Sequence, residues 1–388
     1  MRDSYGAGEQ AAHDIMRSAA ERIDLEVSVD AIGNLTMTLP GCDRGAPRII
    51  VGSHLDSVPQ GGNFDGAAGV VAGLCVVSAL KAAGVTPRCD VSVMGIRAEE
   101  SAWFDVAYIG SGGAFGLLDP QCLSIPRSDN GRSLEATLIE RGFDPQAIRE
   151  RRQLLDPAKI HAYLELHIEQ GPTLAATGLP AAAVTGIRGC KRFRNARCIG
   201  RYGHSGAVNR PQRHDAVAAT VALLHHLESV WLQLEDAGAD LVVTTGELFT
   251  DPALHGPSKI AGETRFVLDV RSVSQDSMNA IATEARQAAV RIGEAYRVAF
   301  DLGATSDSPP AVMDERLRSN LMGLLERPFE MASGAGHDAA IFAKMGVPTG
   351  MIFVRNENGS HNPDESMALG DFAVGAQALT GLLLQETS

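Results

Sequence analysis

The sequence has few features of a nucleic-acid-binding or membrane protein. Its 388 residues carry 34 Lys and Arg against 47 Asp and Glu, a formal charge of -13, and no Lys/Arg-rich run stands out. Because such a chain repels a phosphate backbone, we expect no nucleic-acid partner. Its apolar stretches are shorter than a membrane span, and its start, MRDSYGAGEQ, lacks the basic and apolar regions of a signal peptide. We therefore expect a cytoplasmic protein with no membrane partner.

Cysteines are few and scattered, and no internal repeat or low-complexity tract is present. The six cysteines form no CxxC pair, and in a large cytosolic chain such residues are by default reduced and mostly buried. The pattern indicates neither a disulfide framework nor a structural zinc knuckle. What is present is ordinary globular composition, 45% hydrophobic and 21% charged, in a chain long enough for two domains.

Strands and helices alternate through much of the chain. From residue 47 the pattern predicts a strand over 47–58, a Gly/Ala-rich helix over 66–84, and further strands over 90–99 and 160–171. Such alternation is typical of a sheet covered by helices on both faces. We therefore expect an α/β fold with a mixed, mostly parallel sheet.

Residues 190–305 follow a different order: strand, helix, two strands, helix, strand. This is the ferredoxin-like βαββαβ unit. The α/β character returns after it, with a helix predicted over 314–326 and a strand over 349–355. We expect a larger domain made of residues 1–188 and 307–388, interrupted by a smaller domain over 189–306.

The stretch GSHLDSVPQGGNFDG, residues 52–66, combines one histidine, two aspartates and four glycines at the end of a predicted strand. Residues two apart in a strand face the same way, so His54 and Asp56 project together, like a metal-binding imidazole and the carboxylate that holds its second nitrogen. Without further evidence, a His and an Asp at this spacing are more often a surface histidine near a turn and an aspartate that caps it. The glycines allow the backbone to bring Asp65 back to the strand end. A calcium loop would need regularly alternating oxygen ligands, which are absent.

Three other stretches carry related side chains. Glu99 and Glu100 follow a strand predicted to run parallel to the one bearing His54, and ligands of α/β sheets collect beyond the strand carboxyl ends. Adjacent carboxylates in an extended chain point to opposite sides, so one can bind a metal while the other faces water. His167 in ELHIEQGP and His361 in GSHNPDE would each, alone, more often be structural. Together the four stretches suit two divalent ions such as zinc or manganese.

The chain resembles the M20 metallopeptidase superfamily over nearly its whole length. The resemblance lies, in order, in GSHLDSVPQGGNFDGAAGV, RAEESAWF, ELHIEQGP, GHSG with RHDA, FVLDVRS, SGAGHDAA and GSHNPDE. HIEQGP together with SHNPDE resembles the hydantoinase/carbamoylase branch in particular. That branch includes N-carbamoyl-L-amino-acid hydrolases, allantoate amidohydrolases and β-ureidopropionases.

The resemblance implies a site for two divalent metal ions, zinc or else manganese, cobalt or nickel. One ion would be bound by His54 and His167 and the other by Glu100 and His361, with Asp65 bridging the two.

Catalytic and substrate-binding roles in the larger domain follow from the same resemblance. Glu99 would be the general base that takes a proton from water and passes it to the leaving nitrogen. Asp56 would orient His54. Gln170 would contact the amide or ureido group, and Gly336 in SGAGHDAA would also line the substrate site.

For the smaller domain, the resemblance implies a lid that carries a homodimer interface. His204 would bind substrate in the partner subunit's active site and stabilise the oxyanion of the tetrahedral intermediate. Arg271 would clamp a substrate carboxylate, because a guanidinium matches it bidentately.

Several positions depart from the branch. An asparagine usually stands thirteen residues before the substrate arginine, whereas this chain has Ser258 in SKIAGE, and a hydroxyl cannot make the paired hydrogen bonds of an amide. Arg210 would add a second cation near the pocket, and Trp103 stands where the branch commonly has arginine. We expect these changes to alter the substrate pocket and to spare the metals.

These features predict a metal-dependent amidohydrolase that cleaves a linear C–N bond, in an N-carbamoyl, ureido or amide group, of a small carboxylate-bearing substrate. An aminoacylase or dipeptidase of the same superfamily is the near alternative. A non-catalytic ligand-binding relative is an alternative from a different class, and the presence of Glu99 argues against it because a degenerate site would tolerate loss of the base.

Overall fold

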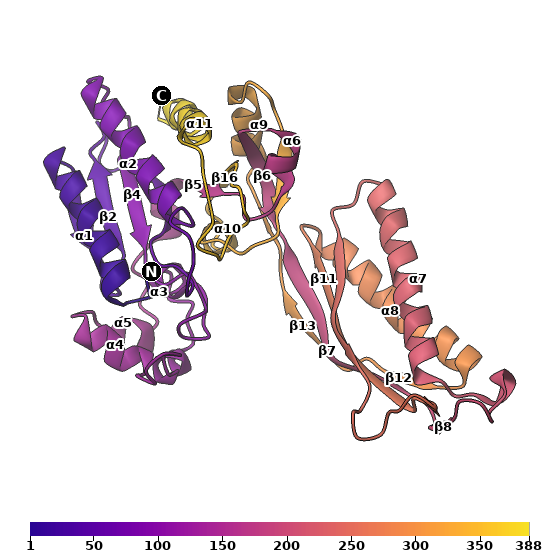
Figure 1. Ribbon diagram of the computed structural model, residues 1–388. Helices are drawn as coiled ribbons and strands as arrows, with labels where there is room; N and C mark the ends of the chain where they lie inside the picture. The colour runs from indigo at the N-terminus through magenta and orange to yellow at the C-terminus, as the bar shows by residue number, and fades with distance from the viewer. Residues whose placement is uncertain (388) are drawn as a thin grey trace. The chain divides into compact units, whose positions relative to one another are not determined.

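The computed structural model describes residues 1–387 (Figure 1). The chain divides into two compact units, one made of Met1–Gly186 together with the segment from Val312 onward, and the other of Ile187–Ala311. Among the helices of the described residues, none combines the length and the apolar character that crossing a membrane requires.

The first unit is built on a nine-stranded sheet in the described chain, with the order β1-β2-β4-β3-β5-β16-β6-β14 and with β15 paired to β6. The central strands β4, β3, β5 and β16 are mutually parallel, whereas β1-β2, β2-β4 and β16-β6 pair antiparallel. The predicted mixed α/β sheet is confirmed, and its four central strands form the parallel part. The strands are β1 (Glu26–Val29), β2 (Leu35–Leu39), β3 (Arg48–His54), β4 (Val91–Ile96), β5 (Ile160–Ile168), β6 (Ala181–Ile187), β14 (Ala311–Val312), β15 (Glu330–Ser333) and β16 (Thr349–Val354).

Helices cover this sheet on both faces. One core gathers apolar residues of α1, α2, α9 and α11 against the sheet, whereas α10 packs on the opposite side of β5. Shorter helices follow β4 and lead into β5. The helices of the first unit are α1 (Ala7–Arg22), α2 (Ala67–Ala82), α3 (Ile109–Ala114), α4 (Leu134–Glu140), α5 (Gln146–Arg149), α6 (Thr173–Thr177), α9 (Glu315–Leu324), α10 (Ala339–Lys344) and α11 (Leu369–Glu386).

Strand β5 shows how this layering positions polar groups. Leu166 joins the core beneath α2 and α11, whereas Tyr163 stacks on Phe342 of α10 with ring centroids 3.7 Å apart. Because side chains alternate along a strand, Glu165 and His167 lie on the same face as Tyr163. Two polar residues of a buried strand therefore point toward the α10 side.

The second unit carries a five-stranded antiparallel sheet in the described chain, with the order β12-β7-β11-β9 and with β13 also paired to β7. Helices α7 and α8 pack on it through an apolar core that includes Phe193, Leu223, Phe266 and Met278. A two-stranded pair, β8-β10, is separate from this sheet. The elements are β7 (Gly189–Ile199), β8 (Gly203–His204), α7 (Ala216–Asp236), β9 (Val242–Phe249), β10 (Lys259–Ile260), β11 (Glu263–Ser272), α8 (Gln275–Tyr296), β12 (Ala299–Asp301) and β13 (Thr305–Ser308).

Candidate metal centre

Strands β3 and β5 bring two histidines together. Their parallel register pairs Val51 with Leu164, and the same register three residues further along each strand aligns His54 with His167. Both imidazoles are buried, at 2% and 1% exposure, and their Nε2 atoms lie 3.5 Å apart. The two rings thus meet at the carboxyl ends of neighbouring parallel strands.

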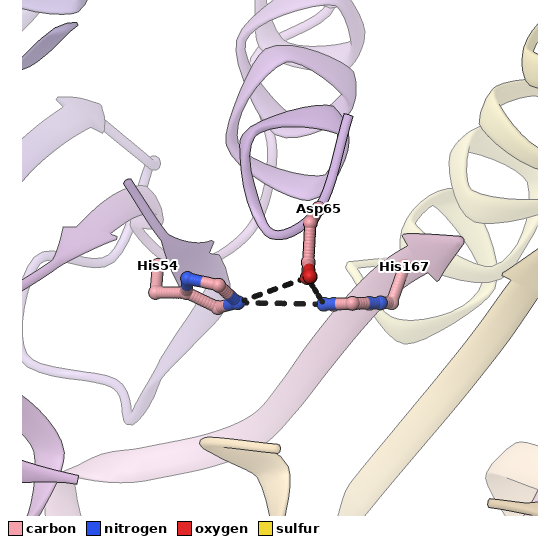
Figure 2. Close-up of side chains that lie close together, drawn as sticks. All are labelled: His54, Asp65 and His167. Carbon is pink, nitrogen blue, oxygen red and sulfur yellow. Dashed lines mark hydrogen bonds and ion pairs between the residues drawn. The ribbon is translucent and has the colours of Figure 1, made fainter. Parts of the chain in front are cut away.

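Asp65 approaches both imidazoles from the start of α2 (Figure 2). Its Oδ1 lies 3.5 Å from Nε2 of His54 and 3.2 Å from Nε2 of His167, and among the described residues no hydrogen-bond donor reaches this buried oxygen. The turn after Asp65 requires glycine, because Gly66 has φ of 66° and a Cβ there would lie 2.5 Å from the His54 ring.

The second ring nitrogens of these histidines are held by the protein. Nδ1 of His54 lies 3.3 Å from Oδ1 of Asp56 and 3.2 Å from its carbonyl oxygen, and Nδ1 of His167 lies 2.9 Å from the carbonyl oxygen of Ile168. Strand β3 ends at His54, so the strand predicted over 47–58 was too long and Asp56 belongs to the following loop. Asp56 nevertheless lies within reach of the His54 ring, and its predicted role of orienting that ring stays a prediction. With Nδ1 engaged, Nε2 of each ring faces Asp65.

Asp56 also fixes the backbone after β4. Its Oδ1 accepts a hydrogen bond from the Glu99 N–H at 3.1 Å, and its Oδ2 accepts one from the Glu100 N–H at 3.2 Å. Oδ2 also accepts the hydroxyl of Ser4 at 2.6 Å. One buried carboxylate therefore joins the His54 ring, the two glutamates and the N-terminal segment.

A second group of ligand atoms shares Asp65. Its Oδ2 lies 3.4 Å from Nε2 of His361, and that nitrogen lies 3.4 Å from Oε1 of Glu100. The amide nitrogen of Gln170 and the hydroxyl of Ser360 donate to the same Oδ2, at 3.1 Å and 3.0 Å. Two sets suited to a metal ion therefore meet at one carboxylate: His54, Asp65 and His167, and Asp65, Glu100 and His361.

This donor set fits divalent metal ions. Imidazole nitrogens and carboxylate oxygens are ligands of zinc, manganese and similar ions. Burial lowers the pKa of His54, but its contacts with Asp56 and Asp65 outweigh burial and raise that pKa well above the usual value. The carboxylates therefore attract positive charge to the point where the imidazole nitrogens converge, and among the described residues Oδ1 of Asp65 has no hydrogen-bond partner.

Glu99 lies beside these ligands without belonging to the two sets that share Asp65. It is 7% exposed, and burial raises the pKa of its carboxyl well above the usual value, an effect that His54 opposes and Glu100 reinforces. A carboxyl with raised proton affinity is suited to accept and return a proton near neutral pH.

A cavity of about 170 Å³ opens onto this site, lined by all five predicted ligands, by Glu99 and by Gln170. Gly336 also lines it, and a Cβ there would lie 1.8 Å from the Tyr108 hydroxyl, so a side chain at this position would force Tyr108 to move. Tyr108 was not anticipated from the sequence. It adopts a left-handed conformation with φ of 60°, a strained backbone for an aromatic residue that is often found at functional sites.

Trp103 is not among the residues that line the cavity, and its expected effect on the pocket stays a prediction. Its side chain is buried, at 4% exposure, and its Nε1 donates to the carbonyl of Ser57 at 2.8 Å. The guanidinium of Arg127 stacks on the indole ring, 4.9 Å from its centroid. The tryptophan therefore packs against the loop that follows β3 rather than facing substrate.

The remaining predicted residues lie in the second unit. His204 is exposed on β8, and its Nδ1 accepts the N–H of Gly206 at 3.1 Å. The carbonyl of Ser258 accepts the N–H of Ser205 at 2.9 Å. Arg271 on β11 donates its Nε to Oδ2 of Asp269 at 2.9 Å and is 39% exposed. The substrate contacts expected of these residues, and of Arg210 on an exposed turn, stay predictions.

The α/β unit carries a cavity of histidines and carboxylates, and this defines a class of protein with candidate ligands for divalent metals. A profile of peptidase family M20/M25/M40 matches residues 50–385, and the chain belongs to this family. The family assigned from the sequence motifs is thereby confirmed.

Relatives and solved structures resemble the chain over nearly its full length. The N-carbamoyl-L-amino acid amidohydrolase of Geobacillus stearothermophilus is 34% identical over 383 residues, which cover 97% of this chain and 90% of that protein. The allantoate amidohydrolase of Bacillus subtilis is 31% identical, with coverage of 92% and 86%. The crystal structure of an amidase of the hydantoinase/carbamoylase family from Burkholderia multivorans superposes with a TM-score of 0.86 at 27% identity, covering 100% of this chain and 92% of that one.

Proposed function

We propose that this protein is a metal-dependent amidohydrolase that cleaves a linear C–N bond, in an N-carbamoyl, ureido or amide group, of a small substrate with a carboxylate. The observation that carries the proposal is the position of Asp65, whose two oxygens face two separate ligand groups. A carboxylate shared by two ions is suited to a two-metal hydrolytic centre. The relatives named as amidohydrolases of N-carbamoyl amino acids and of allantoate support the kind of bond.

Each of the two ligand groups that share Asp65 would hold one metal ion. One divalent ion, zinc or else manganese, cobalt or nickel, would be held by His54 and His167, and a second by Glu100 and His361, with Asp65 between them. Such ions supply Lewis acidity that activates water and polarises the scissile carbonyl. Asp56 and the carbonyl of Ile168 keep the two buried rings oriented through Nδ1, as outer contacts of metal-binding histidines commonly do.

Glu99 would carry the proton. It accepts a proton from the attacking water and returns it to the leaving nitrogen, and its buried place on the cavity wall supports this role. Gln170 offers an amide to the ureido or amide group of the substrate. Gly336 leaves room for the substrate beside Tyr108, since any side chain at that position would fill the space.

We further propose that residues 1–188 and 307–388 form the catalytic domain and that residues 189–306 form a lid that dimerises. Strand β9 is the last strand of its sheet, and its Leu248 and Phe249 are 48% and 49% exposed, as is Val221 of α7 at 55%. An unpaired edge strand with apolar side chains is a liability unless another chain covers it, and a second copy would do so.

In such a dimer, the residues of the lid would complete the site. His204 would reach the partner's cavity and stabilise the oxyanion. Arg271 would bind the substrate carboxylate. The hydroxyl of Ser258 is shorter than the amide usual at that position and cannot make its paired hydrogen bonds, so the substrate contact there would differ.

A panel assay on metal-reconstituted protein tests the proposal, with N-carbamoyl, N-acyl and ureido substrates and separate measurement of ammonia, carbon dioxide and amine. Ammonia with carbon dioxide is the expected result. Release of amine alone would indicate the second candidate, an aminoacylase or dipeptidase, which the peptidase family match favours. No turnover by fully metal-loaded protein would contradict both and leave a non-catalytic binding protein.

A further inference from the structure

We propose that Arg2 and Glu365 are positioning residues of the candidate metal centre, which together fix the backbone of Asp65 so that its carboxylate reaches both ligand groups. Neither residue lines the cavity, and neither is one of the candidate ligands. The inference rests on the proposed function because it concerns the same site. Beyond the ligands themselves, the inference names the residues that hold the backbone of Asp65 in place.

Arg2 spreads its guanidinium over the loop between β3 and α2. Nε donates to the carbonyl of Leu55 at 2.8 Å, and Nη2 donates to the carbonyl of Asp65 at 2.9 Å. Nη1 lies 3.3 Å from the carbonyl oxygen of Gly62 and 3.4 Å from that of Asn63. A planar fork with several donors can hold carbonyls at both ends of one loop, which a single ammonium group cannot do.

The main chain of Arg2 is itself anchored to this loop. Its N–H donates to the hydroxyl of Ser57 at 3.0 Å, and its carbonyl accepts the Ser57 N–H at 2.7 Å. Two residues further on, the buried Ser4 donates to Asp56. The guanidinium therefore extends from a backbone that is already fixed beside the metal ligands, and it is not a loosely held surface side chain.

Glu365 holds the same loop through its N–H groups. Its Oε1 accepts the N–H of Phe64 at 2.9 Å and the N–H of Asp65 at 3.1 Å. Its Oε2 lies 2.8 Å from the hydroxyl of Ser360, which in turn lies 3.0 Å from Oδ2 of Asp65. The side chain is 6% exposed and lies four residues after His361. One buried carboxylate thus ties the Asp65 loop to the loop of a predicted ligand.

The two contacts act on opposite ends of one residue. The N–H of Asp65 is bound by a carboxylate and its carbonyl by a guanidinium, so neither peptide plane beside it can rotate without breaking a charge-assisted hydrogen bond. The residue after it, Gly66, would otherwise allow such rotation because glycine adopts many backbone conformations. Rigid placement of a ligand by its outer contacts is worth roughly 10–100-fold in metal affinity.

Zinc affinity of the purified full-length chain, measured by competition with a chromophoric chelator, tests the inference. We expect Glu365→Gln and Arg2→Met to weaken zinc binding by about 10–100-fold while the circular dichroism spectrum is retained. Asp364→Asn removes an adjacent exposed carboxylate and Arg22→Met an exposed arginine at the end of α1, and both controls should bind zinc as the parent chain does.

Two more variants keep the test decisive if one of these fails to fold. Gly62→Ala introduces a Cβ that would lie 2.2 Å from Oε1 of Glu365, so it should displace that carboxylate and reproduce the loss. Arg2→Lys should recover only part of the affinity lost in Arg2→Met, because an ammonium group replaces the charge but not the fork. If Arg2 and Glu365 only stabilised the fold, their variants and Gly62→Ala would have lower melting temperatures, and the folded proteins would bind zinc as tightly as the parent chain.

The outcomes separate this inference from the proposed function. A parent chain that binds neither zinc nor manganese, cobalt or nickel would overturn the proposed metal centre and this inference with it. A parent chain that binds zinc, with folded Glu365, Arg2 and Gly62 variants of equal affinity, would overturn the inference alone.

Discussion

His54 and His167 face each other from neighbouring parallel strands, with their Nε2 atoms 3.5 Å apart and with Oδ1 of Asp65 within 3.5 Å of both. Two imidazole nitrogens and a carboxylate oxygen with no hydrogen-bond donor among the described residues thus converge inside the protein. Buried polar groups without partners destabilise a fold. Nε2 of His167 already accepts the Gly66 N–H at 3.2 Å, so the group that a bound divalent ion would supply with a missing partner is Oδ1 of Asp65.

Metal should therefore stabilise the folded chain. We expect the melting temperature of chelator-treated protein to rise on addition of zinc or manganese, with about 2.7 kcal/mol gained when free metal is 100-fold above the dissociation constant. Differential scanning calorimetry measures this. Asp65→Ala, which removes the shared ligand, should abolish the increase, and an unchanged melting temperature in the parent chain would count against the metal centre.

Glu99→Gln separates catalysis from metal binding. The amide cannot accept the proton from water, so kcat should fall by at least about 10²–10⁴-fold. Metal content by mass spectrometry should stay that of the parent chain, because the proposal gives Glu99 the proton rather than a place among the five ligands, although its carboxylate also lies close to His54 and Glu100. Full activity in this variant would remove Glu99 from the mechanism.

Gly336→Ala should lower kcat/KM by roughly tenfold or more, since its Cβ would meet the Tyr108 hydroxyl at 1.8 Å and force one of them into the cavity. Tyr108→Phe removes the clashing oxygen. The double variant should accordingly be more active than Gly336→Ala alone. Equal kcat/KM in the parent chain and Gly336→Ala would show that this wall does not contact substrate.

Arg271→Ala should raise KM for carboxylate substrates while kcat changes little. Loss of a hydrogen bond to a charged group costs about 1.5–3 kcal/mol, which corresponds to roughly 10–100-fold. Arg265→Ala is the matched control, because it removes an arginine of the same strand that pairs with Glu263 and is 58% exposed. If both variants keep the parent KM, Arg271 is not the carboxylate-binding residue.

Mixed dimers test whether His204 acts on the partner subunit. His204→Ala and Glu99→Gln should each be inactive alone, and a mixture should regain part of the activity, because one of the two sites in a mixed dimer has both residues intact. Subunit exchange is verified by mass spectrometry of the intact dimers. Absence of recovery after verified exchange would argue that each chain uses its own His204, or none.

The sequence by itself determined the α/β pattern, the family and the residues at the strand ends. His54, Glu99 and Glu100 follow apolar strands that are buried and parallel, and the rule that such strands end at one edge of the sheet was sufficient to bring them together. The candidate ligands stood out by residue type and by their place at strand ends, and their assignment to two ions was what the family resemblance implied. The antiparallel strands β1 and β6 were not anticipated. β1 is short and largely exposed, and β6 is a run of small apolar residues without alternation.

Only the tertiary structure decided which groups hold the ligands. Glu365 contacts the N–H of Asp65 across 300 residues, and the side chain of Arg2 contacts its carbonyl across 63. No local pattern encodes such pairs, because they depend on how loops from distant segments pack at the edge of the sheet. The same reason applies to Trp103, whose burial against Ser57 and Arg127 no local pattern indicates.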